Sequence, residues 1–426
     1  MCGNNTRRSM TYSQEKTLDL FFWIIITGTF LSMLLIILYY VYAFAALSNG
    51  SREFDWLLGI FSDFVAIMEA SLSKNPYEAG GASYPPIAII ILYPFALICK
   101  NAFNTYSGYQ ISINELTSKL VLCVEFWIAF LLFWLLCSVL VALIIIRSFS
   151  FNTKQSIRVL VIAFLSSPFI YIAMRGNAIY FSLVFTLLFF LLYKSPNPWI
   201  REVGYLFLVL AGAIKIYPLF FGVFLLRKRK YWASFRIGIY SVIIFFLSFL
   251  LFEKGLGDIS SFGENLGGFA SDQIRLIETN NLSLSSLLFK LFHFISPDLT
   301  LSSKFHLINA LLLGIAFAIA TISAILSKSD FSRSVICAST IALIPSVSYF
   351  YVLSFMIIPF LEFIKDYDQL HRYKQIIYNL FFIFLFFTPF ILAQNYTLHS
   401  LILISMLGIE AAAALKIKNI RKSPCK

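Results

Sequence analysis

A lysine in the middle of an apolar run is the first residue of this sequence that could do chemistry. Lys215 stands in "AGAIKIYPLFF", and the preceding stretch "VGYLFLVL" holds no acidic side chain. An ionisable side chain at membrane depth usually has a function and a partner of opposite charge. Because no acid lies nearby in the sequence, we expect this partner to be an anionic ligand, for which a phosphate group is the obvious candidate.

Two more residues extend this chemistry. Arg175, in "RGN", is a second cation at the end of an apolar run, and Asp63 begins the segment "DFVAIMEASLSKNPYE". Two cations would offset the charge on a phosphate that leaves a sugar carbon, and a carboxylate would accept the proton of the attacking hydroxyl. Simpler interpretations are that Arg175 reaches toward lipid headgroups and that Asp63 complements a helix dipole.

The composition is that of a membrane protein. Of the 426 residues, 59% are hydrophobic and only 13% are charged. Apolar runs of about 18 residues or more recur along the chain, which is typical of membrane-spanning helices. We expect an all-α transmembrane bundle of about 10–13 helices that forms a single domain over residues 1–426. The short alternating segments of a β-barrel are not seen.

The net charge of +12 is explained by topology better than by nucleic-acid binding. Lysine and arginine gather in short connections, which the positive-inside rule places in the cytoplasm. We therefore expect both termini in the cytoplasm, the bilayer as partner, no nucleic acid, and a plasma-membrane location. Two long loops, 48–119 and 253–305, would lie on the other side. The basic connections are 147–158, 194–201, 227–230, 328–333, 365–374 and the C-terminal tail.

If the basic connections all lie on one side of the membrane, the chain must cross the membrane an even number of times between any two of them. About 25 residues separate 201 from 227, and about 31 separate 333 from 365. Each of these segments fits a helical hairpin with arms of about 11–14 residues, or roughly 16–21 Å. Such arms are shorter than the ~30 Å hydrocarbon core, so the hairpin tips would lie inside the membrane.

The expected tips are "KIYP" (215–218) and "PSVSYF" (345–350). A third tip, "RGN" (175–177), would join helices over 159–174 and 178–193. Non-helical backbone at membrane depth is tolerated only where it lines a protein-enclosed or water-filled cavity. The three tips therefore predict a pit that opens on the outer side, and Lys215 would face it.

The first outer loop contains two short segments that we expect to lie near the membrane surface. The helix that includes Asp63, Ile67 and Ala70 would rest on the membrane through one face. Residues 84–99 would form a juxtamembrane or re-entrant helix that Pro94 interrupts. In the second outer loop, the charged side chains are expected to be solvated; they are Asp258, Glu264, Asp272 and His293.

These motifs resemble a known family. In their order along the chain, they resemble the motifs of the GT-C membrane glycosyltransferases: "SDFVAIMEASLSKNPYE" with "YPP", then "RGN", "AGAIKIYPLFF" and "PSVSYFYVLSFMIIP". The greatest similarity is to glycosyltransferase family 87, polyprenyl-phosphate-mannose-dependent mannosyltransferases and their relatives. The resemblance runs from Asp63 to about Lys230 and includes the later segment. The sequence departs from the pattern in having "FSD" in place of paired acids and no histidine beside Ser348.

The resemblance implies a GT-C-like bundle with an extracytoplasmic active site. Its donor would be a polyprenyl-phosphate sugar, mannose or a similar hexose or pentose. The sugar would pass with inversion to a lipid-linked or glycan acceptor of the cell envelope. Asp63 would be the base, and Arg175, Asn177 and Lys215 would line the donor site. Tyr84, Tyr217 and Glu125 complete the expected substrate-binding residues. The sequence shows no metal cage, so we expect no metal site, with a divalent cation as the alternative.

Two other functions compete with a transferase. A transporter or flippase of lipid-linked sugars would also need a polar pit, but ion-driven transport usually needs acids or histidines within the helices. Only Glu125 is placed for that role, and the inverted repeats common in such carriers are not evident. A polysaccharide polymerase shares large outer loops but has no reason to keep the "DF", "PY" and "YPP" motifs.

Overall fold

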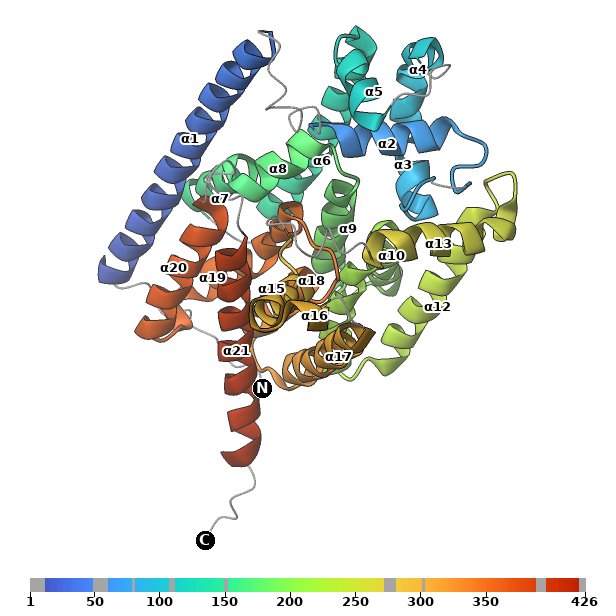
Figure 1. Ribbon diagram of the computed structural model, residues 1–426. Helices are drawn as coiled ribbons and strands as arrows, with labels where there is room; N and C mark the ends of the chain where they lie inside the picture. The colour runs from blue at the N-terminus through green and yellow to red at the C-terminus, as the bar shows by residue number, and fades with distance from the viewer. Residues whose placement is uncertain are drawn as a thin grey trace.

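The computed structural model describes residues 12–48, 60–78, 81–106, 112–148, 152–271, 281–300, 303–387 and 396–420. These ranges form helices, with short 3₁₀ segments, joined by turns and loops, and they contain no strand (Figure 1). The prediction of an all-α protein is confirmed.

The helices follow one another in chain order. The first half contains α1 (Tyr12–Ser48), α2 (Ser62–Leu72), α3 (Pro86–Ile98), α4 (Lys100–Tyr106), α5 (Ile113–Leu120), α6 (Val124–Ser148), α7 (Thr153–Leu165), α8 (Ser167–Arg175), α9 (Ile179–Leu192), α10 (Pro198–Ile214), η2 (Tyr217–Gly222) and α11 (Val223–Arg227). The second half contains α12 (Tyr231–Phe249), η3 (Gly255–Gly257), α13 (Asp258–Ser271), α15 (Leu284–Ile295), α16 (Pro297–Thr300), α17 (Ser303–Leu326), α18 (Asp330–Leu343), η4 (Phe350–Met356), α19 (Ile357–Asp366), η5 (Tyr367–Gln369), α20 (Arg372–Phe387) and α21 (Thr397–Ile420).

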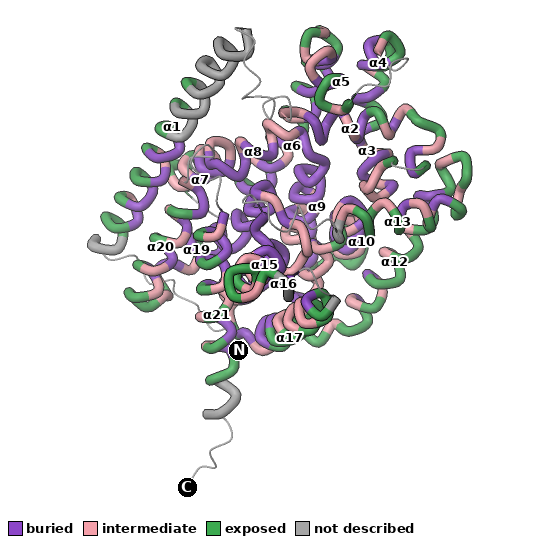
Figure 2. Tube along the Cα trace, viewed as in Figure 1, coloured by how far each residue is buried: buried purple, intermediate pink, exposed green. Residues whose placement is uncertain are grey.

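Several helices are built to cross a membrane. Among the described residues, α6, α12, α17 and α21 are long and apolar enough to span a bilayer, and the bent pairs α3–α4 and α7–α8 raise the number to six if each is one span. Within their most apolar windows, α12 is only 22% buried and α17 only 17%. Both helices have exposed faces (Figure 2), and large apolar residues are among those exposed on each. Exposed apolar surface on this scale fits lipid rather than water, so this is an integral membrane protein.

Each of the three predicted tips is a break between helices. The chain leaves α8 at Gly176, which has a left-handed φ of 60°. At the end of α10, Lys215 takes an extended conformation with φ −146° and ψ 124°. A non-helical segment separates the end of α18, at Leu343, from η4 at Phe350. The local sequence explains these breaks, because Gly176, Pro218 and Pro345 all oppose helix continuation.

The helices that lead to these breaks are short. α9 and α18 have 14 residues and α10 has 17, so they are roughly 21 Å and 25 Å long. After Lys215 the chain folds back, since η2 packs against α10. A Cβ at Gly212 would lie 2.4 Å from Leu219 Cγ, so this close approach requires glycine. All three helices are shorter than the ~30 Å thickness of a bilayer's hydrocarbon core.

The basic connections lie together at the opposite end of these helices. Arg147, Lys194 and Lys365 line one cavity. The ammonium of Lys194 is 3.0 Å from the Asp330 carboxylate. The connection after α11 joins the same end, since its Arg227 Nε donates to a carbonyl just before Asp330, that of Ser327, at 3.1 Å. Connections that were expected to share one side of the membrane therefore share one end of the bundle.

Two helices differ from the expected pattern near prolines. The helix expected over 159–174 is divided into α7 and α8, which meet at a bend of 48°. Pro168 lies in the first turn of α8, where its missing N–H is tolerated, and so α7 ends before it. In contrast, Pro94 does not interrupt α3, which continues to Ile98 before the chain turns by 88°. Apolar helices tolerate an internal proline when neighbouring groups satisfy the freed backbone.

Two expectations for the outer loops are wrong. Helix α2 does not rest on the membrane through one face, because seven of its eleven residues are buried, including Asp63, Ile67 and Met68. Asp258 is not solvated but fully buried, at the start of α13. The side chains of Glu264 and His293 are exposed, and Asp272 lies outside the described residues.

We predict that Gly176→Ala destabilises the protein by about 1–3 kcal/mol. A Cβ at this position would lie 2.5 Å from Phe64 Cβ, and the positive φ would strain any other residue. The detergent-solubilised variant should unfold several degrees below wild type. Gly238→Ala is the control, because a Cβ at Gly238 meets no atom within 4 Å. Equal midpoints for Gly176→Ala and wild type would show that this turn is not tightly packed.

Candidate active site

The carboxylate of Asp63 is the centre of a buried polar cluster. Arg175 binds it in a bidentate manner, with Nη2 2.7 Å from Oδ1 and Nε 3.0 Å from Oδ2. Asn177 Nδ2 donates to Oδ2 at 2.9 Å, and the Tyr84 hydroxyl donates to Oδ1 at 3.1 Å. The residues come from α2, the α8–α9 turn and the start of α3. One carboxylate thus joins three parts of the chain, through an ion pair with Arg175 and hydrogen bonds from Asn177 and Tyr84.

Asp63 is positioned by an unusual residue before α2. Phe61 has a left-handed φ of 62°, and its N–H donates to the carbonyl of Met174 at 2.8 Å. A non-glycine residue in this conformation costs roughly 1–2 kcal/mol. The Phe61 ring makes edge contacts with Phe126, Trp127 and Phe130 at centroid distances of 4.7–5.5 Å. This packing offsets the strain and fixes the start of α2 against the end of α8.

The backbone at the start of α9 fixes the orientation of the Asn177 side chain. Its Oδ1 accepts the backbone N–H of Ile179 at 2.9 Å, at the start of α9. The amide nitrogen is therefore left to face Asp63. Asn177 is fully buried, so the geometry of this contact is set by the turn and not by a mobile side chain.

Lys215 is the free cation of the cluster. Its Nζ lies 5.0 Å from the centre of the Tyr84 ring, a cation–π contact. It makes no hydrogen bond or ion pair with any residue that the structure describes. An ammonium group has three N–H donors, so these donors are available to a ligand.

Tyrosine hydroxyls surround the same space. The Tyr217 hydroxyl is buried and unpaired within the described part of the chain. Tyr351, on η4, stacks on Tyr171 with a centroid distance of 6.0 Å and an interplanar angle of 17°. Tyr351 is also an electrostatic neighbour of Asp63. Neither Tyr171 nor Tyr351 was expected from the sequence, although Tyr171 stands four residues before Arg175 and so on the same face of α8.

The tip over 345–350 is held by the end of the second outer loop. Asn281 Nδ2 donates to the Ser346 carbonyl at 3.2 Å, and its Oδ1 accepts the N–H of Ser348 at 3.0 Å. The N–H of Leu282 donates to the Ser348 carbonyl at 2.7 Å. These bonds satisfy the non-helical backbone of the tip and thereby fix the segment that carries Tyr351.

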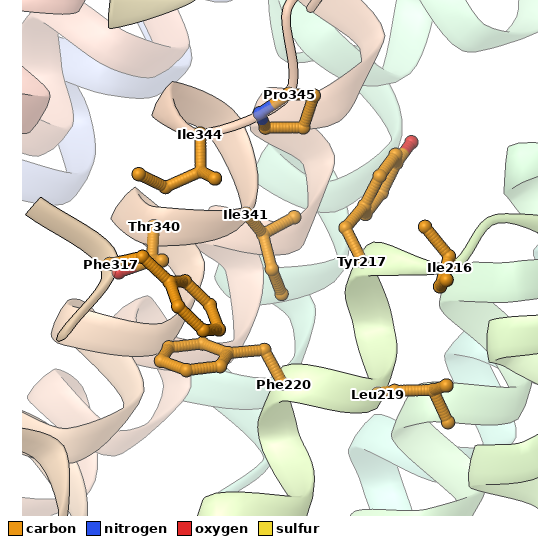
Figure 3. A pocket seen from close by; sticks show the side chains of 9 residues that line it. All are labelled: Ile216, Tyr217, Leu219, Phe220, Phe317, Thr340, Ile341, Ile344 and Pro345. Carbon is orange, nitrogen blue, oxygen red and sulfur yellow. The ribbon is translucent and has the colours of Figure 1, made fainter. Parts of the chain in front are cut away.

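An apolar cavity begins directly after Lys215 (Figure 3). It has a volume of about 500 Å³ and lies between η2 on one side and α17 and α18 on the other. Ile216 is 76% exposed and Phe317 is 43% exposed, so the cavity reaches the outer apolar surface. The lining residues are Ile216, Tyr217, Leu219, Phe220, Phe317, Thr340, Ile341, Ile344 and Pro345.

Glu125 stands apart from the cluster. It is exposed in the first turn of α6, and its backbone carbonyl accepts the thiol of Cys99 at 3.5 Å. Within the described residues, no contact joins it to Asp63 or Lys215. Of the seven residues expected to form the site, contacts join five, namely Asp63, Tyr84, Arg175, Asn177 and Lys215, and Tyr217 lines the adjoining cavity.

The electrostatics of the cluster keep Asp63 ionised. Burial raises its pKa, but the Arg175 guanidinium and the hydrogen bonds from Arg175 and Asn177 lower it further, so the net pKa lies below the usual value of 3.8. Among the described residues, no three histidine, cysteine, aspartate or glutamate side chains gather as a metal-binding group.

A sequence profile of glycosyltransferase family 87 matches residues 83–346, more than half of the chain. The chain belongs to glycosyltransferase family 87. The match includes Tyr84, Arg175, Asn177 and Lys215, whereas Asp63 lies just before it. No curated protein and no solved structure gives a significant match. Family 87 membership confirms the resemblance and identifies the protein as a membrane glycosyltransferase.

We predict that the Asp63 carboxylate stabilises the folded protein at neutral pH and that this contribution is lost at low pH. A carboxyl group whose pKa is lowered by folding stabilises the protein above its unfolded pKa, about 3.9, and this contribution is lost as the pH falls through the folded pKa. Breaking a buried ion pair costs about 3–5 kcal/mol, and the partial exposure of Arg175 favours the lower end. Asp63→Asn should therefore unfold several degrees below wild type from pH 5 to 8.

The measurement is the thermal midpoint of both proteins in detergent across this range and down to pH 3. The difference between them should shrink only below about pH 4. Glu264→Gln, which changes an exposed acid on α13, is the control and should unfold like wild type. A difference that disappears already near pH 6 would mean that burial outweighs Arg175 and raises the pKa.

Proposed function

We propose that this family 87 glycosyltransferase moves a sugar from a polyprenyl phosphate to an acceptor hydroxyl. The observation that carries the proposal is the position of Lys215. Its unpaired ammonium lies against Tyr84 of the Asp63 cluster, and the next residue, Ile216, lines an apolar cavity that reaches the outer surface. A donor that joins an anionic phosphate to a hydrocarbon chain matches both features at once.

The phosphate would be held mainly by Lys215. Its three N–H donors are free, whereas Nε and Nη2 of Arg175 already donate to Asp63. The guanidinium still adds positive potential at short range in a site of low dielectric. As the bond from the sugar to the phosphate breaks, negative charge grows on the departing oxygen. Fixed cations close to that oxygen stabilise the transition state more than the ground state.

The hydrocarbon chain of the donor would lie in the cavity of Figure 3. Its lining is apolar apart from Thr340 and the Tyr217 hydroxyl, and Phe220 and Phe317 pack together at a centroid distance of 5.2 Å. Water finds few hydrogen-bond partners in such a space. An isoprenoid chain that enters it removes both its own apolar surface and that of the lining from water. This argues for a lipid-linked donor and against a nucleotide sugar.

Asp63 would serve as the base only after one of its hydrogen bonds is exchanged. A carboxylate has about four acceptor positions, and four donors already occupy those of Asp63. The Tyr84 hydroxyl is the easiest to displace, because it is neutral and has the longest contact, 3.1 Å. We propose that the acceptor hydroxyl takes its place on Oδ1.

The reaction is then a single displacement. The acceptor oxygen attacks the anomeric carbon, the carbon–oxygen bond to the phosphate breaks, and the acceptor proton passes to Asp63. Attack from the face opposite the phosphate inverts the anomeric configuration. Since a carboxylate of low pKa is a weak base, the proton would move late, once the acceptor oxygen has become acidic. The lysine and arginine supply the charge stabilisation, so no divalent metal is required.

The active site would open on the extracytoplasmic face. It lies at the end of α9 and α10 that is remote from the basic connections, and the positive-inside rule places those connections in the cytoplasm. The acceptor would be a lipid-linked or soluble glycan of the cell envelope. Mannose, or a hexose or pentose of similar size, is the sugar that we propose.

We predict that Asp63→Asn abolishes sugar transfer and that Lys215→Met lowers donor use about 10-fold or more, equivalent to about 1.4 kcal/mol or more of lost binding. The assay supplies membranes with a radiolabelled polyprenyl-phosphate sugar and a lipid extract, and measures the labelled product. Glu69→Gln and Lys100→Met are the matched controls, because both side chains are exposed and away from the cluster. Transfer by Asp63→Asn at the wild-type rate, with equal expression, would rule out its role as base.

A further inference from the structure

A second polar cavity lies at the opposite end of α9 from the active site. It has a volume of about 290 Å³ and is enclosed by the end of α6, the end of α9 and helix α19. Its polar lining comprises Arg147, Ser148, Lys194, Glu362 and Lys365. The 14 residues of α9 place it roughly 20 Å from Asn177, so it is a separate site.

Cations outnumber carboxylates in and around this cavity. Lys365 pairs with Glu362 at 2.6 Å. Lys194 pairs with Asp330 at 3.0 Å, but Asp330 is also bound by Arg333 at 2.6 Å. Two carboxylates are therefore shared among three cations before Arg147 is counted.

Two groups that line the cavity have no partner of their own. Arg147 is exposed in the last turn of α6 and makes no hydrogen bond or ion pair with the residues that the structure describes. The hydroxyl of Ser148 is buried and likewise unpaired there. A buried hydroxyl without a hydrogen bond is costly, and like charges in one cavity repel. Both costs fall if an anion with several acceptor oxygens enters the cavity.

The rest of the lining shows what kind of anion would fit. Apolar side chains from the same three helices form the remaining wall: Ile144, Leu187, Phe190, Leu191, Ile358 and Leu361. A small soluble anion would leave this wall in contact with water. An anion that carries hydrocarbon chains would cover it. Basic pockets between membrane helices on the cytoplasmic side are known binding places for anionic lipid headgroups.

We propose that this cavity binds the phosphate headgroup of an anionic membrane lipid. The phosphate oxygens accept hydrogen bonds from Arg147 and the Ser148 hydroxyl, with Lys194 and Lys365 nearby. The first part of an acyl chain lies against Leu187, Leu191 and Ile358. The bound lipid joins the ends of α6, α9 and α19. This site is independent of the proposed donor and acceptor.

The test is native mass spectrometry of the full chain in detergent with added dioleoylphosphatidylglycerol or dioleoylphosphatidylcholine. We expect one tightly retained phosphatidylglycerol, at least about threefold more occupied than phosphatidylcholine at the same concentration, which corresponds to about 0.7 kcal/mol. Arg147→Gln should abolish this preference. Arg372→Gln, an exposed arginine that does not line the cavity, should keep it. Thermal midpoints of all three proteins establish that the variants are folded.

Three outcomes would overturn the proposal. Equal retention of the two lipids would show that the headgroup charge is not recognised. Full preference in folded Arg147→Gln would place the lipid elsewhere. Displacement of phosphatidylglycerol by inorganic phosphate at the same concentration would show a site for a free anion instead of a lipid. None of these results bears on sugar transfer, so the two proposals fail separately.

Discussion

The contact between Asp63 and Arg175 is the interaction on which the active site depends. It joins residues that are 112 positions apart and is bidentate at 2.7 and 3.0 Å. Such a pair must overcome the cost of removing two charges from water, which it can do only with good geometry and further hydrogen bonds. Asn177 and Tyr84 supply those bonds. The same contacts fix α2, the α8–α9 turn and the start of α3 relative to one another.

The depth of the site is a second constraint, and it follows from helix length. α9, α10 and α18 run from the basic end of the bundle toward the three helix breaks, and each is too short to cross a ~30 Å hydrocarbon core. In the topology that we propose, polar side chains and non-helical backbone thus gather below one membrane surface. A lipid-linked substrate can reach such a place from within the bilayer, whereas a charged soluble donor would have to leave water. The apolar cavity beside Lys215 is in keeping with this route.

The sequence predicted the helical class, the three breaks and the members of the polar cluster. The breaks were predictable because charge in the short connections limits the number of crossings, and because Gly176, Pro218 and Pro345 interrupt helices locally. The importance of Lys215 was predictable because nothing nearby in the sequence neutralises it. These are local or pattern-based signals, which a single sequence carries.

Other features depend on tertiary contacts and were not predictable. The pairing of Asp63 with Arg175 was missed because nothing in the sequence marks two residues this far apart as neighbours. The burial of Asp258 was missed for the same reason. The position of Tyr351 depends on bonds from Asn281 and Leu282 that fix its loop. By contrast, the division of the helix before Arg175 was predictable from a local signal, Pro168, although it was not expected. Glu125 was expected to join the site from its place near a helix end, but the direction of α6 leaves it exposed.

The most direct test of this account is a structure of the protein determined with bound polyprenyl phosphate. The account predicts that the phosphate lies within hydrogen-bonding distance of Lys215 Nζ, and that the first isoprene units occupy the cavity between Tyr217 and Ile341. Asp63 and Arg175 should remain paired. A phosphate bound away from Lys215, or a chain that leaves this cavity empty, would contradict the proposed donor site.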